Sequence, residues 1–207
     1  MTYLLIAFTA LVSITAFRKE EWFSKLQFNA YQIYHRKEIH RLLTHGFLHA
    51  NWTHLIVNML VLFFFGPQVE IYLKEILPES IPYLSRMVYL LFYFGAIIVS
   101  ALLSLYRHKD DAWYNAVGAS GAVSAVLFCF IFFRPWEMLY FYGIIPVPGI
   151  IMGVLYLIYS YYMSRKGIDN INHDAHFIGA VFGFIFPLFM NFRLIYYFID
   201  QLKSFSF

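Results

Sequence analysis

Six apolar stretches separated by shorter polar segments dominate the pattern of hydrophobic and polar positions along the chain. A helix that crosses a bilayer needs about 20 mostly apolar residues, and the stretches reach or approach that length. Most connections between them are short, and the sequence shows no repeat, low-complexity tract or linker. The pattern predicts an all-α membrane protein, in which six transmembrane helices form one bundle and a single domain over residues 1–207. The stretches cover residues 2–17, 51–73, 87–106, 116–133, 146–163 and 174–197.

The longest connection, residues 18–50, mixes charged and aromatic side chains at loosely helical spacing. That mixture suits an amphipathic segment at the level of the lipid headgroups, and it suits an ordinary structured loop equally well. The apolar stretch at residues 2–17 has no Lys/Arg-rich leader before it and no clear small-residue cleavage site. We therefore expect a retained helix there rather than a removed signal peptide.

The composition indicates a membrane as the solvent. Hydrophobic residues make up 61% of the 207 and charged residues 13%, whereas a soluble domain usually has about 25% charged residues. A single core of this size could not hide so much apolar surface from water. The net charge of +3 is scattered rather than gathered in a basic stripe, which argues against nucleic acid as a partner. Cys129 is the only cysteine, so an intramolecular disulfide is excluded.

Polar residues inside membrane segments are costly and usually functional, and Ser120 is the first of them. Small residues surround it, which is typical of a face where two membrane helices pack closely. The same pattern also suits a nucleophile, because Gly118 and Gly121 leave room for a substrate backbone. A serine at the start of a helix also lies near unpaired N–H groups, which can stabilise an oxyanion.

A second candidate is His176, which Gly179 and Gly183 follow at helical spacing. The helix face that packs closely against a neighbour then also carries the imidazole. If that neighbour is the small-residue face around Ser120, the histidine meets the hydroxyl and can act as its base. A histidine bonded to a carbonyl inside the bundle is the alternative. Asp174 is two residues away and faces elsewhere, so we expect it at the loop end, as an N-cap, and predict a Ser-His dyad.

His54 and Asn58 are four residues apart and share one helix face. Their side chains can donate hydrogen bonds to the oxyanion of acyl transfer, together with the backbone N–H of Ser120. Structural hydrogen bonding between helices is the alternative. His45 and His49 have the same spacing, and we expect them to be structural.

Taken together, these segments resemble the rhomboid family of intramembrane serine proteases, in their order and in the helices on which they lie. The resemblance implies a six-helix rhomboid-like bundle, with Ser120 as nucleophile, His176 as base and the oxyanion held by His54, Asn58 and the Ser120 N–H. It implies no metal and no organic cofactor. The matching pieces are His49-x4-His54-x3-Asn58, Gly118-Ala119-Ser120-Gly121 and Ala175-His176-x2-Gly179-x3-Gly183.

The resemblance also implies partners and a location. Substrates are expected to be single-pass transmembrane proteins in the lipid, cut near the end of their helix, with water entering from the extracytoplasmic side. The short chain looks like a minimal bacterial form, so we expect a multi-pass protein of the bacterial inner (cell) membrane; its oligomeric state is left open. Lys and Arg are more numerous in the loops that this orientation places outside, which opposes the positive-inside rule. We follow the motifs, because their order is more specific than a tally of loop charges.

The resemblance implies two further features, and the chain departs from the family at two positions. The helix predicted at 146–163 resembles a lateral gate, with residues 146–149 as a flexible hinge, and Glu70 resembles a structural carboxylate. Where the family often has Trp-Arg in its first loop, this chain has His40-Arg41. Many members carry an aromatic ring four residues after the nucleophile to support the histidine. Ser124 stands there, so another group must orient His176.

The residues leave three alternatives. The eight histidines suggest a membrane di-iron enzyme such as a fatty-acid desaturase, but the paired HxxHH spacing is missing. A rhomboid-like protein that binds client helices without cutting them is a second, although such relatives usually lack the serine or the histidine. A transporter is the third, and the absence of inverted repeats argues against it.

Overall fold

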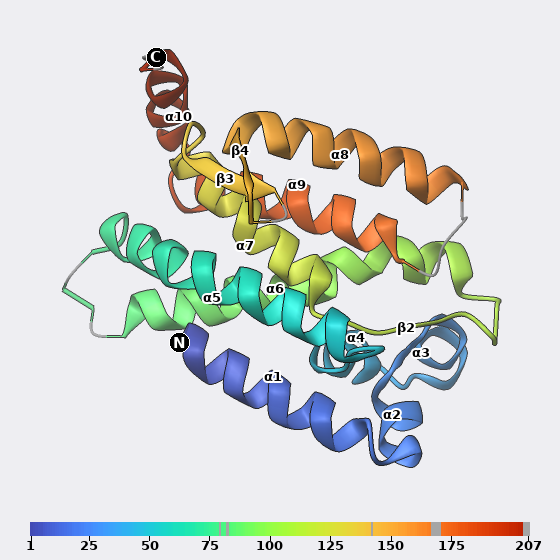
Figure 1. Cartoon of the computed structure of the whole chain (residues 1–207). Coiled ribbons are helices and arrows are strands. Elements are labelled where there is room, and N and C mark those ends of the chain that lie inside the picture. Colours follow the sequence, from blue (N-terminus) through green and yellow to red (C-terminus); the bar gives the residue numbers. More distant parts are fainter. Residues whose placement is uncertain (79, 82, 142, 167–170, 205–207) are drawn as a thin grey trace.

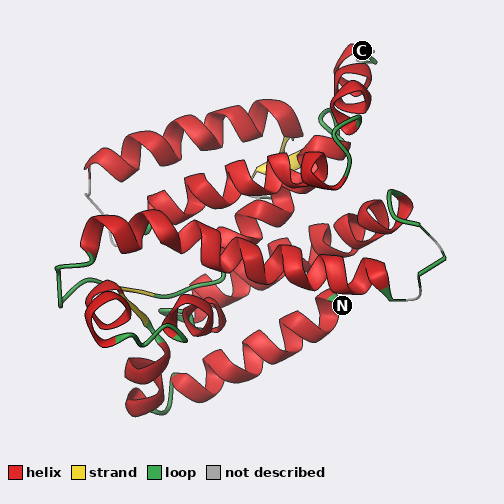
Figure 2. Ribbon diagram, turned by 180° about the vertical axis from the view of Figure 1, so that it is seen from behind, coloured by secondary structure: helices red, strands yellow, loops and turns green. Residues whose placement is uncertain are grey.

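The computed structural model describes residues 1–78, 80–81, 83–141, 143–166 and 171–204. Helices occupy all six apolar stretches, and they run roughly side by side, with most loops at the two ends of the bundle (Figures 1 and 2). Their bounds are α1 Thr2–Ala16, α5 Trp52–Glu75, α6 Leu84–His108, α7 Ser120–Phe133, α8 Gly149–Lys166 and α9 His173–Met190.

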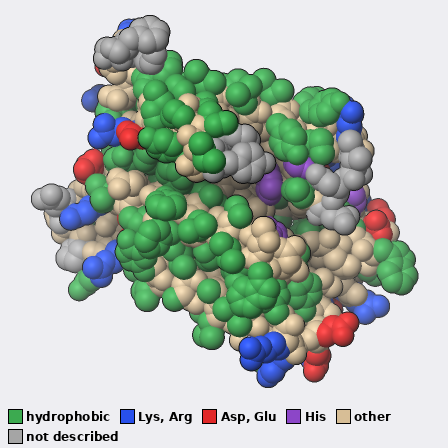
Figure 3. All heavy atoms as spheres, in the orientation of Figure 1, with side chains coloured by type: hydrophobic (Ala, Val, Ile, Leu, Met, Phe, Trp, Pro, Cys, Tyr) green, Lys and Arg blue, Asp and Glu red, His purple; other side chains and the backbone are tan. Residues whose placement is uncertain are grey.

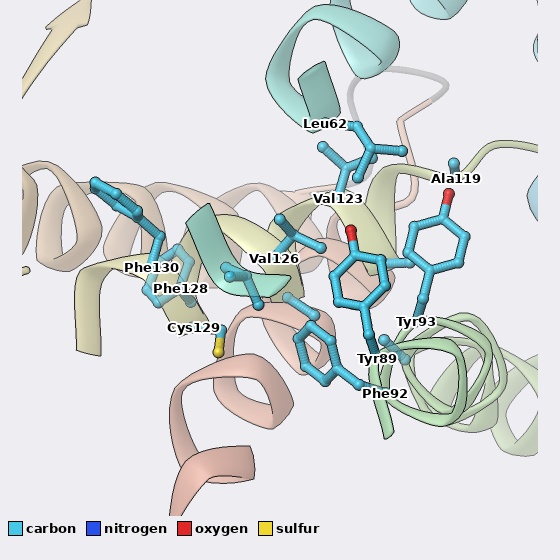
Figure 4. Close-up of a cluster of buried hydrophobic side chains, with 14 of the residues drawn as sticks. Leu62, Tyr89, Phe92, Tyr93, Ala119, Val123, Val126, Phe128, Cys129 and Phe130 are labelled. Atoms are coloured by element: carbon cyan, nitrogen blue, oxygen red, sulfur yellow. The ribbon is translucent and has the colours of Figure 1, made fainter. Parts of the chain in front are cut away.

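Helix α7 forms the centre of the bundle and contacts α5, α6, α8 and α9. It is apolar on every side, which is the pattern of a helix surrounded by protein, and nearly all of its residues are buried. Figure 4 shows Val123, Val126 and Cys129 of α7 lying with Tyr89 and Phe92 of α6 in this core. The nucleophile candidate is therefore the first residue of the most enclosed helix.

By length and composition, three helices in the described part of the chain can cross a membrane: α5, α6 and α9. Helices α1 and α7 are apolar but have only 15 and 14 residues, and four tyrosines and two terminal basic residues lower the mean hydropathy of α8. The prediction of a helical membrane bundle is confirmed, whereas the number of spans is confirmed only for these three.

Three predicted boundaries were wrong. The fourth helix begins at Ser120 rather than at residue 116, because Asn115–Ala116 forms strand β2. The fifth helix begins at Gly149 rather than at residue 146, because strand β4 (Ile145–Pro148) precedes it and pairs antiparallel with β3 (Met138–Phe141). The sixth helix ends at Met190, where the backbone of Asn191 becomes extended, and a separate helix α10 (Leu194–Lys203) follows.

The segment between α1 and α5 folds into a series of short elements, as a structured loop does. Its centre is Arg41, which is buried and donates to the carbonyls of Ser24 (2.7 Å) and Gln27 (2.9 Å) and to the carboxylate of Glu38 (2.7 Å). These bonds fold the loop back on itself, next to the start of α5. The elements are α2 Glu20–Leu26, β1 Phe28–Asn29, α3 Ala30–Arg36, α4 Arg41–Thr44 and the 3-10 turn η1 His45–Phe47, with β1 paired to β2.

The surface and one polar contact fit a membrane bundle. In Figure 3 hydrophobic side chains cover the middle of the visible face, and the charged side chains lie mainly toward its ends. Glu70 accepts hydrogen bonds from the backbone N–H (2.5 Å) and the hydroxyl (2.5 Å) of Thr2, and so ties α5 to the start of α1. The expected structural role of this carboxylate agrees with that contact.

Candidate active site

A turn at Gly118 brings His54 and Ser120 to one place. Gly118 has φ +129°, a conformation that only glycine adopts without strain, and its N–H donates to the carbonyl of His45 at 3.0 Å. A Cβ at this position would lie 2.7 Å from His54 Cε1 and 3.7 Å from Ser120 Oγ. The missing side chain therefore leaves a space that both polar groups border.

The start of α9 is fixed by its cap. Asn172 accepts a hydrogen bond from the N–H of Ala175 at 3.1 Å, and its side chain also bonds the hydroxyl of Ser104 on α6. The N–H of His176 donates to the carbonyl of Asn172 at 3.3 Å. These contacts place His176 in the first turns of α9, with the backbone of that turn anchored to α6.

Helices α7 and α9 meet backbone to backbone. A Cβ on Gly179 would overlap the carbonyl oxygen of Gly121, and a Cβ on Gly183 would overlap the backbone of Ala125. Both glycines are buried. Small residues at a four-residue interval allow this close approach, as they do in other pairs of membrane helices.

The α7–α9 contact also determines where Ser120 and His176 lie along their helices. A Cβ on Gly121 would lie 3.3 Å from the carbonyl oxygen of Ala175 and would overlap Ser100 of α6. Ser120 precedes Gly121, and His176 follows Ala175, so the two residues adjoin a point at which α7 contacts the backbone of α9. Gly121 is buried and serves this packing, whereas Gly118 borders the reacting groups.

Helix α5 supplies two further polar groups. Asn51 caps it by accepting a hydrogen bond from the N–H of His54 at 2.8 Å. Asn58 lies one turn beyond His54 and is buried, and among the described residues its Nδ2 atom has no hydrogen-bond acceptor. A buried amide normally finds a partner, so this one has a donor to offer to a bound oxygen.

Two neutral histidines support this side of the site. Burial lowers the pKa of His45 to about 4 and the pKa of His49, which also lies near His54, to about 3. The ring of His49 is edge-on to that of His54, with centroids 5.0 Å apart. Since the single hydroxyl proton of Ser13 goes to the carbonyl of Phe47 (2.7 Å), His49 Nδ1 carries the proton in its 2.9 Å bond to Ser13. The contacts of His49 with His54 and Ser13 agree with the structural role expected for His49.

This burial predicts a pH-dependent stability. The folded pKa values of His45 and His49 lie below the ordinary value of 6.5, so their contribution is complete above pH 6.5 and is lost as the pH falls toward 4. The thermal unfolding midpoint in detergent should drop over that range. His49→Asn keeps a donor for Ser13 and should flatten the slope, whereas the exposed His35→Asn should retain it. Equal slopes in wild type and His49→Asn would contradict the prediction.

Asp174 takes a different place from the one expected. The N-cap of α9 is Asn172, and Asp174 in the first turn bonds Arg107 of α6 and the hydroxyl of Ser164 at the end of α8. Its carboxylate therefore joins three helices. The contact with Arg107 could not be predicted from sequence spacing, because the two residues are 67 positions apart in the chain.

The aromatic ring that runs parallel to His176 was also missed. The ring of Tyr156 on α8 is nearly parallel to the imidazole, with centroids 6.3 Å apart and planes at 19°. The chain has 17 tyrosines, and neither motif nor spacing distinguishes this one. Only the absence of a ring at Ser124 indicated that some other group was needed.

In the parts of the chain that the structure describes, no three His, Cys, Asp or Glu side chains are grouped as metal ligands. The eight histidines thus form no iron-binding set within those ranges, which gives the desaturase alternative no support.

Comparisons with known proteins identify the family. A profile described as "Rhomboid domain" matches residues 36–193, a range that contains every candidate residue of the site. "RHOMBOID-like protein 12, mitochondrial" of Arabidopsis thaliana is 30% identical over 152 residues, which are 69% of this chain and 44% of that protein. "Putative rhomboid protease YdcA" of Bacillus subtilis (strain 168) is 30% identical over 145 residues, 70% of this chain and 64% of that protein. The chain thus spans less than two thirds of either relative. With the profile covering most of its length, the chain belongs to the rhomboid family, whose members are intramembrane serine proteases.

Proposed function

We propose that the chain is an intramembrane serine endopeptidase with a Ser120–His176 dyad. The observation that carries the proposal is the backbone contact between α7 and α9, because Ser120 and His176 are the chain neighbours of Gly121 and Ala175, which face each other there. Family membership and the printed name of the Bacillus subtilis relative support peptide hydrolysis as the reaction.

The proposed reaction is acyl transfer in two halves. Ser120 Oγ attacks the carbonyl carbon of the scissile peptide while His176 takes the hydroxyl proton. The carbon–nitrogen bond then breaks, and His176 returns the proton to the leaving amine. A water molecule attacks the acyl-enzyme with His176 again as base, which releases the carboxylic acid and restores the Ser120 hydroxyl.

Negative charge on the carbonyl oxygen needs donors already in place. Ser120 is the first residue of α7, and the N–H groups of a first helical turn have no partner within the helix. His54 borders the same space as Ser120 Oγ, and the buried amide of Asn58 lies one turn farther along α5. We assign the oxyanion site to these three groups.

One prediction tests the oxyanion assignment. Asn58→Ala removes a donor that acts mainly when charge develops, so kcat should fall about 10-fold or more with KM little changed. Cleavage of a reporter protein with one transmembrane helix, followed in proteoliposomes, gives both constants. An unchanged kcat would leave Asn58 with a structural role only.

We further propose that α1, α5, α6, α7, α8 and α9 all cross the membrane. Helix α7 has only 14 residues, about 21 Å at 1.5 Å per residue. It is enclosed by other helices, and irregular backbone is tolerated at membrane depth where protein covers it. A chain of this kind can meet the transmembrane helix of a substrate within the lipid.

The orientation is proposed from the family resemblance, with the N-terminus inside and the site open to the extracytoplasmic side. The helices α5, α7 and α9 begin at Trp52, Ser120 and His173, and their first turns carry the candidate residues. One relative carries "mitochondrial" in its name and the other is bacterial. The bacterial inner membrane therefore stays a prediction.

A fluorophosphonate probe tests whether the site is an enzyme or a binder of client helices. The probe reacts with a serine whose base is in place, so we expect one adduct per wild-type chain and none on Ser120→Ala. The His35→Ala variant, changed at a surface histidine, should label like wild type. No labelling of a folded wild-type chain would favour the binding protein instead.

A further inference from the structure

Tyr156 of α8 contacts a residue on each of the two helices that carry the proposed dyad. Its ring lies nearly parallel to the imidazole of His176, with planes at 19° and centroids 6.3 Å apart. His173, the neighbouring ring on α9, instead meets His176 edge-on at 76°. Tyr156 is thus an offset, nearly parallel neighbour of the imidazole, at a centroid distance within the range of favourable ring pairs.

The other end of Tyr156 is held by the nucleophile's helix. Its hydroxyl lies 2.7 Å from Ser124 Oγ, and the two share a hydrogen bond. Ser124 is buried and follows Ser120 by four residues, so both lie on one face of α7. Tyr156 therefore contacts α7, the helix of Ser120, through its hydroxyl, and it contacts α9, the helix of His176, through its ring.

The position of Tyr156 depends on α8, which is an outer helix of the bundle (Figure 1). The helix is anchored at its start, where the N–H groups of Gly149 and Ile150 donate to the carbonyls of Glu137 (2.9 Å) and Pro135 (2.7 Å). An apolar, partly open pocket of about 190 Å³ lies between the first half of α8 and helices α7 and α9. The contacts of Tyr156 with α7 and α9 therefore add to those that hold α8 in the bundle.

We propose that Tyr156 is a positioning residue for His176, holding the imidazole in the plane from which it reaches Ser120. The inference rests on the proposed function. Position 124 lies on the same face of α7 as the nucleophile, but Ser124 has a hydroxyl and no ring. The aromatic ring beside His176 is that of Tyr156, which comes from α8. Orientation of the base then requires that α8 be packed against α7 and α9.

The test uses the full chain in proteoliposomes and a reporter protein with one transmembrane helix. Tyr156→Leu and Tyr156→Met remove the ring and should lower kcat about 10- to 100-fold, the cost of a misplaced catalytic group, with KM within about twofold. Tyr156→Phe keeps the ring and should stay within about threefold of wild type. Tyr162→Leu makes the same change at an exposed tyrosine of α8 and should leave kcat unchanged. Each variant is assayed below its thermal unfolding midpoint.

Two results would overturn the inference: ring-free variants at position 156 with wild-type kcat, or a Tyr156→Phe variant as slow as Tyr156→Leu. The first shows that the ring is dispensable, and the second that the hydroxyl rather than the ring matters. Ser120→Ala separates this from the proposed function. If that variant still cleaves the reporter, the dyad fails; if it is inactive while Tyr156→Leu is normal, only the positioning role fails.

Discussion

Ser120→Ala and His176→Ala should each reduce cleavage of a membrane-anchored reporter by at least about 10⁴-fold, because a nucleophile and its base act as one unit. Alanine at position 120 removes the oxygen that forms the acyl-enzyme. Alanine at position 176 leaves that oxygen protonated and unreactive. The double variant should be no slower than either single variant, since each one alone already disables the first step.

Matched substitutions control for handling and folding. Ser204→Ala and His35→Ala change the same residue types at exposed positions and should cleave at the wild-type rate. Turnover is measured in proteoliposomes with equal amounts of folded protein. Cleavage within tenfold of wild type in either dyad variant would end the assignment of that residue.

Gly183→Ala is expected to have the largest effect on stability. The added Cβ would overlap the backbone of Ala125, and backbone cannot turn aside as a flexible side chain can. Overpacking usually costs about 1–3 kcal/mol, and we expect the upper end of this range or more. Separating α7 from α9 should also lower kcat about 100-fold through misplacement of His176, although position 183 is two turns away from it.

Gly95→Ala is the matched control, because it makes the same change inside a helix of the same bundle. A Cβ there would lie 3.7 Å from Phe182, an ordinary contact. Alanine favours a helix over glycine by about 1 kcal/mol, so the unfolding midpoint should stay the same or rise. Thermal unfolding and reporter cleavage are measured on both variants. A Gly183→Ala protein with the stability and rate of Gly95→Ala would show that the close α7–α9 contact is not needed.

The spacing of apolar and small residues was sufficient to predict the helical stretches and the helix face on which α7 and α9 meet. Gly179 and Gly183 stand four residues apart, and the structure places both against the backbone of α7. Local spacing determines such faces, because residues at i and i+4 always share one side of a helix. The order of the three motifs was likewise readable from the chain alone, and it indicated the family that the comparisons show.

Contacts between distant segments could not be read in the same way. Pro146 and Pro148 suggested a hinge at residues 146–149. Residues 145–148 instead form a strand that pairs with residues 138–141. The contact of Tyr156 with Ser124 joins residues 32 positions apart, and that of Asp174 with Arg107 joins residues 67 apart. Such partners depend on how α6, α7 and α8 pack, which no local pattern specifies.

An experimental structure of the fluorophosphonate adduct tests the dyad most directly. We predict phosphorus bonded to Ser120 Oγ, a ring nitrogen of His176 about 3 Å from that oxygen, and the phosphonyl oxygen accepting hydrogen bonds from Asn58 and the Ser120 N–H. An adduct on a different serine, or an imidazole turned to the far side of α9, would contradict the account.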